Sequence, residues 1–406
     1  MSEKKLVAID LFAGIGGLSL GLRAAGVEVA ASVEMDDSCH EMYNRNFPTT
    51  RFIHQDIRLL DPLQLRDELG TDIDVIVGGP PCQGFSLIGL RDPEDDRSKL
   101  IFEFRRFVKT LQPKYFVMEN VPGMLSAAGG QWVAELIQQL DSDGYNVAEP
   151  KILCASEFGA PQERNRVFII GTRKDLPVRA SAPVPTHVSA RDVLLGKARS
   201  QLLPVSATVR DAISDLPEID DHLHLFEGHE VEYDKPPMSA YAKMMRGIGP
   251  DANFFGPVPN TWNSAVCSNC KRVEHGPVLT QRFMEAPQGT TVPVSRLYKL
   301  QWENTANTLR AGTPSSRGSY SSPRPVHPET PRCISVREGA RLQGFPDWFE
   351  FHPTKWHGFR QVGNSVSPMV AKAVAEAIKN ADLRNQGEVP SSGSSMWSSL
   401  AKRSAT

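Results

Sequence analysis

One cysteine of the 406-residue chain stands in a setting that favours chemistry over packing. Cys82 follows Pro80 and Pro81 in the segment GGPPCQGFS, Gly78–Ser86, directly after an apolar run that predicts a strand. A free cysteine is more often a small buried hydrophobe, but prolines and glycines are poor packing residues inside a strand. Because ligands of an open α/β sheet bind at the carboxyl ends of its strands, we predict that Cys82 is a nucleophile at that edge.

Two further polar segments supply groups that suit a reaction at a thiol. Glu119 and Asn120 end the strand predicted at Tyr115–Val121, and a carboxylic acid buried there would protonate or hydrogen-bond a substrate nitrogen. Arg164 and Arg166, in the segment QERNR, alternate at strand spacing and are expected on one side as clamps for an anion or a base. The alternatives are a helix-capping pair at the strand end and solvated arginines.

A glycine-rich turn, DLFAGIGG at Asp10–Gly17, joins the first predicted strand to a helix. Glycines let the backbone come close to a ligand, and a helix start offers free amide groups. Glu34 ends the second predicted strand, where an acid accepts hydrogen bonds from ribose hydroxyls, and Asp56 follows the third and suits an adenine amino group. These positions predict an adenosyl cofactor across the sheet edge. The alternative is a pair of solvated strand-end carboxylates.

These side chains require a frame that brings strand ends together. Short apolar runs alternate with amphipathic stretches as far as about Arg173, which predicts an α/β fold with a parallel, doubly wound sheet. The predicted strands are Leu6–Phe12, Val27–Glu34, Arg51–Gln55, Asp74–Gly79, Tyr115–Val121, Val147–Cys154 and Val167–Arg173. The predicted helices are Gly17–Ala25, Asp37–Phe47, Ser98–Leu111, Gln131–Leu140, Ser239–Arg246, Val336–Gln343 and Pro368–Lys379.

The character of the chain changes after Asp175, where prolines and short polar segments begin to dominate. We therefore predict a smaller, loop-rich domain at 185–330 beside a catalytic domain formed by 1–184 and 331–381. The serine-rich end, 382–406, is predicted to be a disordered tail.

The formal net charge of −2 conceals an asymmetry within the chain. Residues 205–234 contain nine acidic side chains against the single basic Arg210, whereas residues 271–341 contain eleven Lys and Arg against five Glu. Nucleic acids bind to faces rich in cations, which neutralise phosphates. A nucleic-acid-binding face is therefore expected in 271–341.

The six cysteines are too sparse for a disulfide framework. Cys267 and Cys270 form CSNC, with His275 five residues on, but a zinc site would need a further ligand, for which His222, His224 and His229 are the candidates. Two free thiols and no metal are the preferred interpretation.

No run of about 18 apolar residues occurs, and the N-terminus lacks a signal-peptide core, so a cytoplasmic protein without a membrane span is expected.

Taken together, these segments closely resemble the DNA (cytosine-5) methyltransferase family, of the bacterial modification-methylase type. The family's cofactor loop is similar to Asp10–Gly17, its catalytic Pro-Cys to Pro81 and Cys82, its Glu-Asn-Val to Glu119–Val121, and its Gln-x-Arg-x-Arg to Gln162–Arg166. REGARLQGFP, Arg337–Pro346, and GNSVSP, Gly363–Pro368, resemble its last two motifs. Six motifs in the family's order make coincidence negligible.

The resemblance implies a Rossmann-like methyltransferase sheet with a target recognition domain at 185–330. It implies S-adenosyl-L-methionine as cofactor, bound by Phe12, Gly14, Gly16, Glu34, Met35, Asp56, Ile57, Pro81, Leu100, Asn364, Ser365 and Val366. Cys82 would add to carbon 6 of a flipped cytosine while Glu119, Asn120, Arg164 and Arg166 assist. The expected contacts with double-stranded DNA are Gln83, Ser86, Ile88, Arg97, Thr308 and Arg310.

Gly84–Arg97 resembles the family's catalytic loop, in which Ile88 is either an apolar wedge in DNA or a residue packed on its own protein. A transfer-RNA cytosine-5 methyltransferase is the runner-up, although the short Cys-Phe-Thr element of such enzymes is absent from the sequence. A binding module without catalysis is the third hypothesis. We expect a monomer, cytoplasmic and nucleoid-associated, either paired with a cognate restriction endonuclease or solitary.

Overall fold

The computed structural model describes residues 5–81, 100–198, 200–312 and 324–388. The strands are β1 Val7–Leu11, β2 Glu28–Glu34, β3 Arg51–His54, β4 Val75–Gly78, β5 Tyr115–Asn120, β6 Tyr145–Val147, β7 Lys151–Cys154, β8 Gln162–Glu163, β9 Asn165–Arg173, β10 Val231–Glu232, β11 Val266–Cys267 and β12 Ala306–Asn307. The α-helices are α1 Gly17–Ala24, α2 Asp37–Asn46, α3 Pro62–Leu69, α4 Leu100–Leu111, α5 Gln131–Ser142, α6 Ala190–Leu194, α7 Val209–Ile213, α8 Ala240–Met245, α9 Pro277–Glu285, α10 Val336–Gln343, α11 Lys355–Asn364 and α12 Pro368–Asn385.

Eight of these strands form one sheet in the described part of the chain, in the order β3-β2-β1-β4-β5-β9-β6, with β7 also paired to β9. The first five strands are parallel, and the order reverses between β1 and β4. Ligands of open α/β sheets bind at such a reversal, outside the carboxyl ends of the strands. The ends of β1, β2, β4 and β5 are therefore where the site is to be sought.

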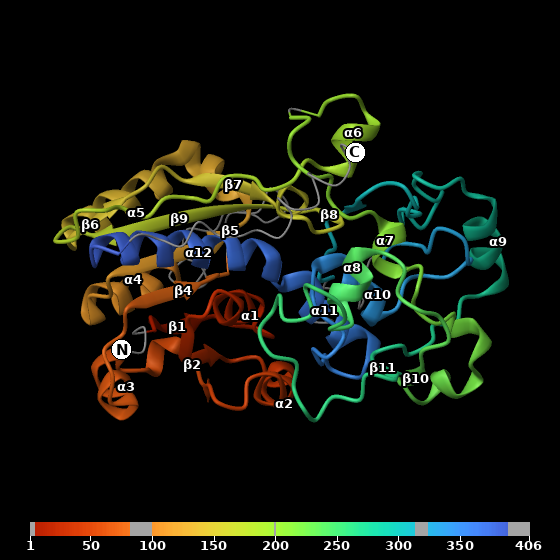
Figure 1. Ribbon diagram of the computed structural model, residues 1–406, viewed down its shortest axis with the longest axis horizontal. Coiled ribbons are helices and arrows are strands. Elements are labelled where there is room, and N and C mark those ends of the chain that lie inside the picture. Colours follow the sequence, from red (N-terminus) through yellow and green to blue (C-terminus); the bar gives the residue numbers. More distant parts are fainter. Residues whose placement is uncertain (1–4, 82–99, 199, 313–323, 389–406) are drawn as a thin grey trace.

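Helices cover both faces of the sheet (Figure 1). Alternate residues of β1 and β5 face opposite sides, as strand geometry requires. Ala8 and Val117 belong to the cluster shared with α1, α2 and α12, whereas Ile9 and Phe116 belong to the cluster shared with α3, α4 and α5. This three-layer α/β/α architecture agrees with the doubly wound fold predicted from the sequence.

The prediction of a parallel sheet is confirmed for the five strands from β3 to β5 and is wrong for β9, β6 and β7. β9 runs antiparallel to β5, and β6 and β7 run antiparallel to β9. A parallel pair needs a crossover connection, but β7 and β9 are joined by a short return that contains only β8 and a 3-10 turn at Ala155–Phe158. The strand predicted at Val147–Cys154 is two strands, because Pro150 between them cannot donate to a ladder.

The C-terminal helix α12 lies beside α1 on one face of the sheet, which returns the end of the chain to its beginning (Figure 1). α12 extends beyond the predicted end at Lys379, so the boundary of the predicted tail at 382 is wrong. Asn385 donates to the Tyr115 hydroxyl at 2.9 Å and accepts from the Val178 amide at 2.8 Å. These bonds hold the last turn of the helix on the sheet. Residues 389–406 lie outside the described residues.

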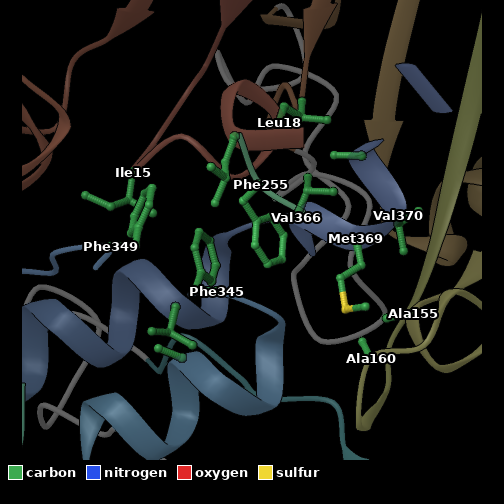
Figure 2. Packing of buried hydrophobic residues seen from close by; sticks show 14 of the residues in the cluster. Ile15, Leu18, Ala155, Ala160, Phe255, Phe345, Phe349, Val366, Met369 and Val370 are labelled. Atoms are coloured by element: carbon green, nitrogen blue, oxygen red, sulfur yellow. The ribbon is translucent and has the colours of Figure 1, made fainter. Parts of the chain in front are cut away.

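The middle of the chain, 185–330, contains short helices and two-residue strands, in agreement with the predicted loop-rich character. It also shares a hydrophobic cluster with the sheet. Figure 2 shows Phe255 from this region in the same cluster as Leu18 of α1 and Val366 near α12, and Phe255 is 2% exposed. The domain boundaries stay a prediction, because apolar packing is continuous across them.

Ion pairs join the acidic stretch 205–234 to the basic stretch 271–341, and the pair of Arg341 and Asp215 is buried on both sides. Arg341 contacts Asp215 at 3.1 Å, Arg332 contacts Glu218 at 2.9 Å, and Arg272 contacts Asp220 at 3.0 Å. Part of the charge asymmetry seen in the sequence therefore holds the two stretches together instead of forming a face for nucleic acid. The described helices include none that is long and apolar enough to cross a membrane.

Candidate active site and cofactor site

The carboxylate of Glu119 is the buried acid at the sheet edge. It ends β5, is 8% exposed, and contacts Arg166 of β9 with 3.0 Å between Oε1 and Nε. Burial raises the pKa of Glu119, while the positive charges of Arg166 and Arg164 act against the rise. A carboxyl group in these surroundings keeps its proton to higher pH than an exposed one, so it can act as a proton or hydrogen-bond donor.

Asn120 positions the chain that leads to the predicted nucleophile. Its side-chain amide donates to the carbonyl of Pro80 at 2.9 Å, and its oxygen accepts from the amide of Val121. Gly79 lies so close to Glu119 that a Cβ there would come within 2.9 Å of Oε2. The end of β4 is therefore fixed against the end of β5. Pro81 is half-buried, and Cys82, the predicted nucleophile, lies outside the described residues.

Arg164 and Arg166 have different surroundings, contrary to the expectation that both face one anion or base. Arg164 is 2% exposed and donates to the carbonyls of Leu309 at 3.0 Å and Gly363 at 2.8 Å. Burial, and to a lesser extent Arg166, lowers the pKa of Arg164 to about 9. Its terminal nitrogens are thus engaged by backbone, whereas Arg166 faces the carboxylate of Glu119.

The glycine-rich turn after β1 has the backbone that a close ligand requires. Phe12, Gly14 and Gly16 all have positive φ, at 59°, 56° and 97°. Such a φ is unusual for a bulky residue such as Phe12 and marks a constrained turn. A Cβ on Gly14 would meet nothing within 4 Å, so the backbone is open on that side. α1 begins at Gly17 without a cap from Gly16, and because the Ser19 amide donates to Asp10 at 3.1 Å, the amides of Gly17 and Leu18 are the ones left for a ligand.

Glu34 is anchored beside this turn. Its Oε2 accepts from the Gly14 amide at 2.9 Å, and its Oε1 accepts from the amides of Met35 and Asp36 at 2.8 and 2.9 Å. Burial raises the pKa of Glu34, while these three amides act in the opposite direction. The Met35 side chain is 61% exposed next to it. A fixed acceptor beside an exposed apolar side chain suits a ribose and its attached base.

The remaining predicted cofactor residues differ in how accessible their side chains are to a ligand. Asp56 lies at the end of the third strand as expected, but Arg58 holds its carboxylate at 2.6 Å and lowers its pKa. Ile57 is 4% exposed, so its side chain packs in the core and only its backbone remains for a ligand. Leu100, at the start of α4, is half-buried against the same core.

The segment GNSV, Gly363–Val366, at the end of α11 touches the start of α1. A Cβ on Gly17 would come within 2.2 Å of the Ser365 hydroxyl and 2.3 Å of the Val366 carbonyl. Asn364 is exposed, while Ser365 and Val366 are each 8% exposed. The segment that carries Asn364, Ser365 and Val366 therefore meets the helix that follows the glycine-rich turn.

A buried amide chain that the sequence analysis did not identify supports this loop. Gln162 donates to Gln343 at 2.7 Å, and Gln343 donates to the Ser365 carbonyl at 2.7 Å. Arg360 of α11 forms an ion pair with Asp36, beside Glu34. The motifs contain these glutamines, but only the tertiary arrangement makes them partners.

The predicted DNA contacts fall into two groups. Gln83, Ser86, Ile88 and Arg97 lie outside the described residues, as does most of the loop that carries them. Thr308 and Arg310 are exposed, and the Thr308 hydroxyl donates to the Glu163 carbonyl at 2.6 Å, which places this segment beside the end of β8, next to Arg164.

The CSNC pair is buried. The sulfur atoms of Cys267 and Cys270 are 3.2 Å apart, and both are free thiols. Within the described residues, no group of three or more His, Cys, Asp and Glu side chains is arranged to hold a metal ion.

Comparison with known proteins decides among the alternatives that the sequence leaves open. The family model for C-5 cytosine-specific DNA methylases matches residues 6–380. The chain belongs to this family. It is 41% identical over 391 residues to the type II methyltransferase M.XorII of Xanthomonas oryzae pv. oryzae, covering 95% of this chain and 87% of that protein. It is 34% identical to M.DdeI of Desulfomicrobium norvegicum, covering 94% and 91%.

Solved structures agree with the fold. A prophage-encoded E. coli protein described as a DNA modification methyltransferase matches with a TM-score of 0.74 and 32% identity, over 93% of this chain and 99% of that one. The S. pombe Dnmt2 methyltransferase matches with a TM-score of 0.58 at 17% identity, which supports the fold alone. The chain is therefore a DNA (cytosine-5-)-methyltransferase that uses S-adenosyl-L-methionine, and its substrate is DNA.

Proposed function

We propose that the enzyme methylates carbon 5 of a flipped cytosine through a covalent bond to Cys82, with Glu119 as the acid. The observation that carries this proposal is the buried Glu119, paired with Arg166 at 3.0 Å at the end of β5. The bond from Asn120 to the Pro80 carbonyl aligns the adjoining strand end, two residues before Cys82. A thiol and a protonated carboxyl at one sheet edge suit addition to a ring that must accept a proton or hydrogen bond.

The chemistry starts from the weak nucleophilicity of carbon 5. The Cys82 thiolate forms a bond to carbon 6, and Glu119 donates to ring nitrogen 3, so negative charge moves to carbon 5. S-adenosyl-L-methionine supplies an electrophilic methyl group. After carbon 5 is methylated, a base or water takes its proton, Glu119 recovers its own, and the thiolate leaves by elimination. Arg166 holds Glu119 and contacts the base.

Arg164 is a positioning residue in this proposal. Its two bonds link the Gly363 carbonyl, in the loop that borders the cofactor turn, to the Leu309 carbonyl, next to Thr308. A side chain that is 2% exposed cannot reach a phosphate without moving. We infer that Arg164 fixes the position of the segment Gly363–Val366 relative to the segment Thr308–Arg310.

We propose that the cofactor lies over the turn Phe12–Gly16, with its ribose at Glu34 and its adenine near Met35 and Asp56. Asn364, Ser365 and Val366 close the site from the C-terminal side. The support is the open side of Gly14 and the fixed carboxylate of Glu34, which the Gly14, Met35 and Asp36 amides orient.

Residues 185–330 are proposed to recognise a short duplex sequence, while the base rotates into the pocket at a cost of a few kcal/mol. The enzyme acts as a monomer in this proposal, since one base is modified at each visit. Its relatives are named as type II methyltransferases, which favours a cognate restriction endonuclease in the same system.

Adduct trapping tests the proposed chemistry. With 5-fluorocytosine in the target site there is no proton to remove from carbon 5, so elimination is blocked and protein remains bound to DNA. We expect wild type to form a denaturation-resistant adduct that contains one added methyl group. Cys82→Ala forms none, and Cys154→Ala, a control at another free cysteine, forms it at the wild-type level. An adduct with Cys82→Ala would refute the assignment.

A further inference from the structure

A four-residue tip, Pro293–Arg296, is an exposed turn of the middle region with two residues in a strained backbone conformation. Val294 and Arg296 have φ of 68° and 56°. Positive φ is an outlier for a β-branched residue such as valine, and such outliers gather at ligand clamps and other functional sites. The Val294 side chain is 78% exposed, so core packing does not explain the strain.

The stem below the tip is rigid, so the strained conformation is held in place. Thr291 pairs with Tyr298, and the Val292 amide donates to the Leu297 carbonyl at 2.7 Å. Val292 is fully buried, and the Lys299 ammonium donates to the Phe283 carbonyl of α9 at 2.8 Å. The tip therefore presents the exposed side chains of Val294 and Arg296 from a fixed base.

The Arg296 side chain is exposed, and its guanidinium forms no hydrogen bond or ion pair within the described residues, although the backbone amide donates to the Val292 carbonyl at 3.0 Å. Most other cations of 271–341 are used internally: Arg272, Arg332 and Arg341 in ion pairs, and Lys299 on a carbonyl. A guanidinium left unpaired on a rigid, strained tip has its five donors available to an external acceptor.

The position of the tip in the chain relates it to the reacting site. After the stem the chain enters β12, which pairs with β8, and β8 is followed directly by the arginines that face Glu119 and the cofactor loop. In Figure 1, α9 lies at the right-hand end of the molecule and the chain after it runs back towards β8. The segment thus extends from the tip to the edge where the base is modified.

We propose that Arg296 is a specificity-determining residue that hydrogen-bonds a guanine of the target sequence in the major groove, with Val294 as the apolar contact beside it. Bidentate bonding of arginine to O6 and N7 of guanine is the commonest specific protein–DNA contact, and valine suits a thymine methyl group. The inference rests on the proposed function, because it requires duplex DNA bound along 185–330.

The test compares methylation of every short sequence by bisulfite sequencing of a randomised plasmid library. Loss of a bidentate contact changes discrimination by about 5- to 150-fold. We expect Arg296→Ala to lower methylation of the wild-type site by at least about 10-fold. Methylation of sites that differ from it at one guanine should rise relative to methylation of the wild-type site. Arg296→Lys keeps the charge but loses discrimination at the same guanine.

Two further variants separate this role from folding and from charge. Val294→Gly leaves Arg296 intact and accepts the positive φ, so we expect an unfolding temperature no lower than wild type and weaker guanine discrimination. Lys243→Ala removes an exposed cation of α8 and is expected to preserve the sequence profile.

Other results would overturn the inference. A uniform loss at all sequences with Arg296→Ala, restored by Arg296→Lys, would make Arg296 a phosphate contact. An unchanged profile in both variants would mean that the tip does not touch bases. No methylation by wild type would instead refute the proposed function, and this inference with it.

Discussion

At the scale of single residues, the proposed chemistry depends on one buried acid, Glu119, whose negative charge is balanced by neighbouring arginines. Burial raises the pKa of Glu119, whereas the cations of Arg166 and Arg164 lower it. Without the arginines the acid would hold its proton too firmly to give it up, and without burial it would be ionised at neutral pH. The pairing places the carboxyl where it can donate and then recover a proton.

This balance predicts a pH dependence. The active form of Glu119 is protonated and its pKa is raised, so kcat falls as pH rises through that raised value. Arg166→Gln removes a nearby positive charge, so the alkaline limb should move to higher pH, by about one unit or more, while kcat falls at all pH values. Glu119→Gln should lower kcat by about 10²–10³-fold and abolish the limb. A kcat profile from pH 5 to 10 measures both.

A shift of the limb to lower pH in Arg166→Gln would contradict this electrostatic account. So would a Glu119→Gln variant that keeps both the wild-type kcat and the limb. Measurements at one ionic strength and at a saturating concentration of DNA exclude effects of pH on DNA binding.

At the scale of elements, the cofactor site depends on the contact between the start of α1 and the loop after α11. Gly17 packs against Ser365 and Val366 with no room for a side chain. Gly17→Ala should therefore displace this loop and raise KM for S-adenosyl-L-methionine by roughly 10-fold, since small misplacements are costly at such sites. Gly276→Ala, where a Cβ would meet nothing within 4 Å, is the control.

Steady-state kinetics distinguishes this prediction from general damage. The expected result is a raised cofactor KM with an unchanged KM for DNA and an unfolding temperature near that of wild type. An unchanged cofactor KM in Gly17→Ala would show that the loop does not border the cofactor.

Some of these elements could be predicted from the sequence and others could not. Strand ends that carry Glu34, Glu119 and Asn120 were predictable, because period and turn signals locate them locally. α3 was missed although Asp61 caps its first turn and Gly70 ends it in the left-handed conformation, since the helix has only eight residues and a weak apolar face. The direction of β9 was not predictable, because the pattern of a buried strand is the same in either direction.

Partnerships between distant segments were also beyond the sequence. Arg164 was expected beside Arg166, but its partners, the carbonyls of Leu309 and Gly363, are 145 and 199 residues away. Because every residue has a backbone carbonyl, the residue types do not indicate which carbonyl accepts a hydrogen bond from a distant side chain. The same holds for the bond between Gln162 and Gln343.

At the scale of the whole molecule, buried ion pairs and one continuous hydrophobic cluster join the middle region to the sheet. Arg341 is fully buried between Asp215 and Asp347. Removing one partner of a buried pair leaves charge uncompensated, so Asp215→Asn should destabilise the protein by about 3 kcal/mol. Arg210→Gln, which breaks an exposed pair with Glu303, should cost less than about 1 kcal/mol.

Urea unfolding followed by circular dichroism measures both variants. Because the apolar packing is continuous, we expect wild type and Asp215→Asn to unfold in one transition, with only the midpoint shifted. Two transitions, with the earlier one alone moved by Asp215→Asn, would show that the middle region is an independent folding unit.

The measurement that tests the central claim most directly is bisulfite sequencing of plasmid DNA from cells that express this enzyme, beside the same experiment with Cys82→Ser. We predict cytosines protected from conversion at one short recurring sequence with wild type, and full conversion with Cys82→Ser. Protection that persists without the Cys82 thiol, or complete conversion in both, would contradict the proposed chemistry.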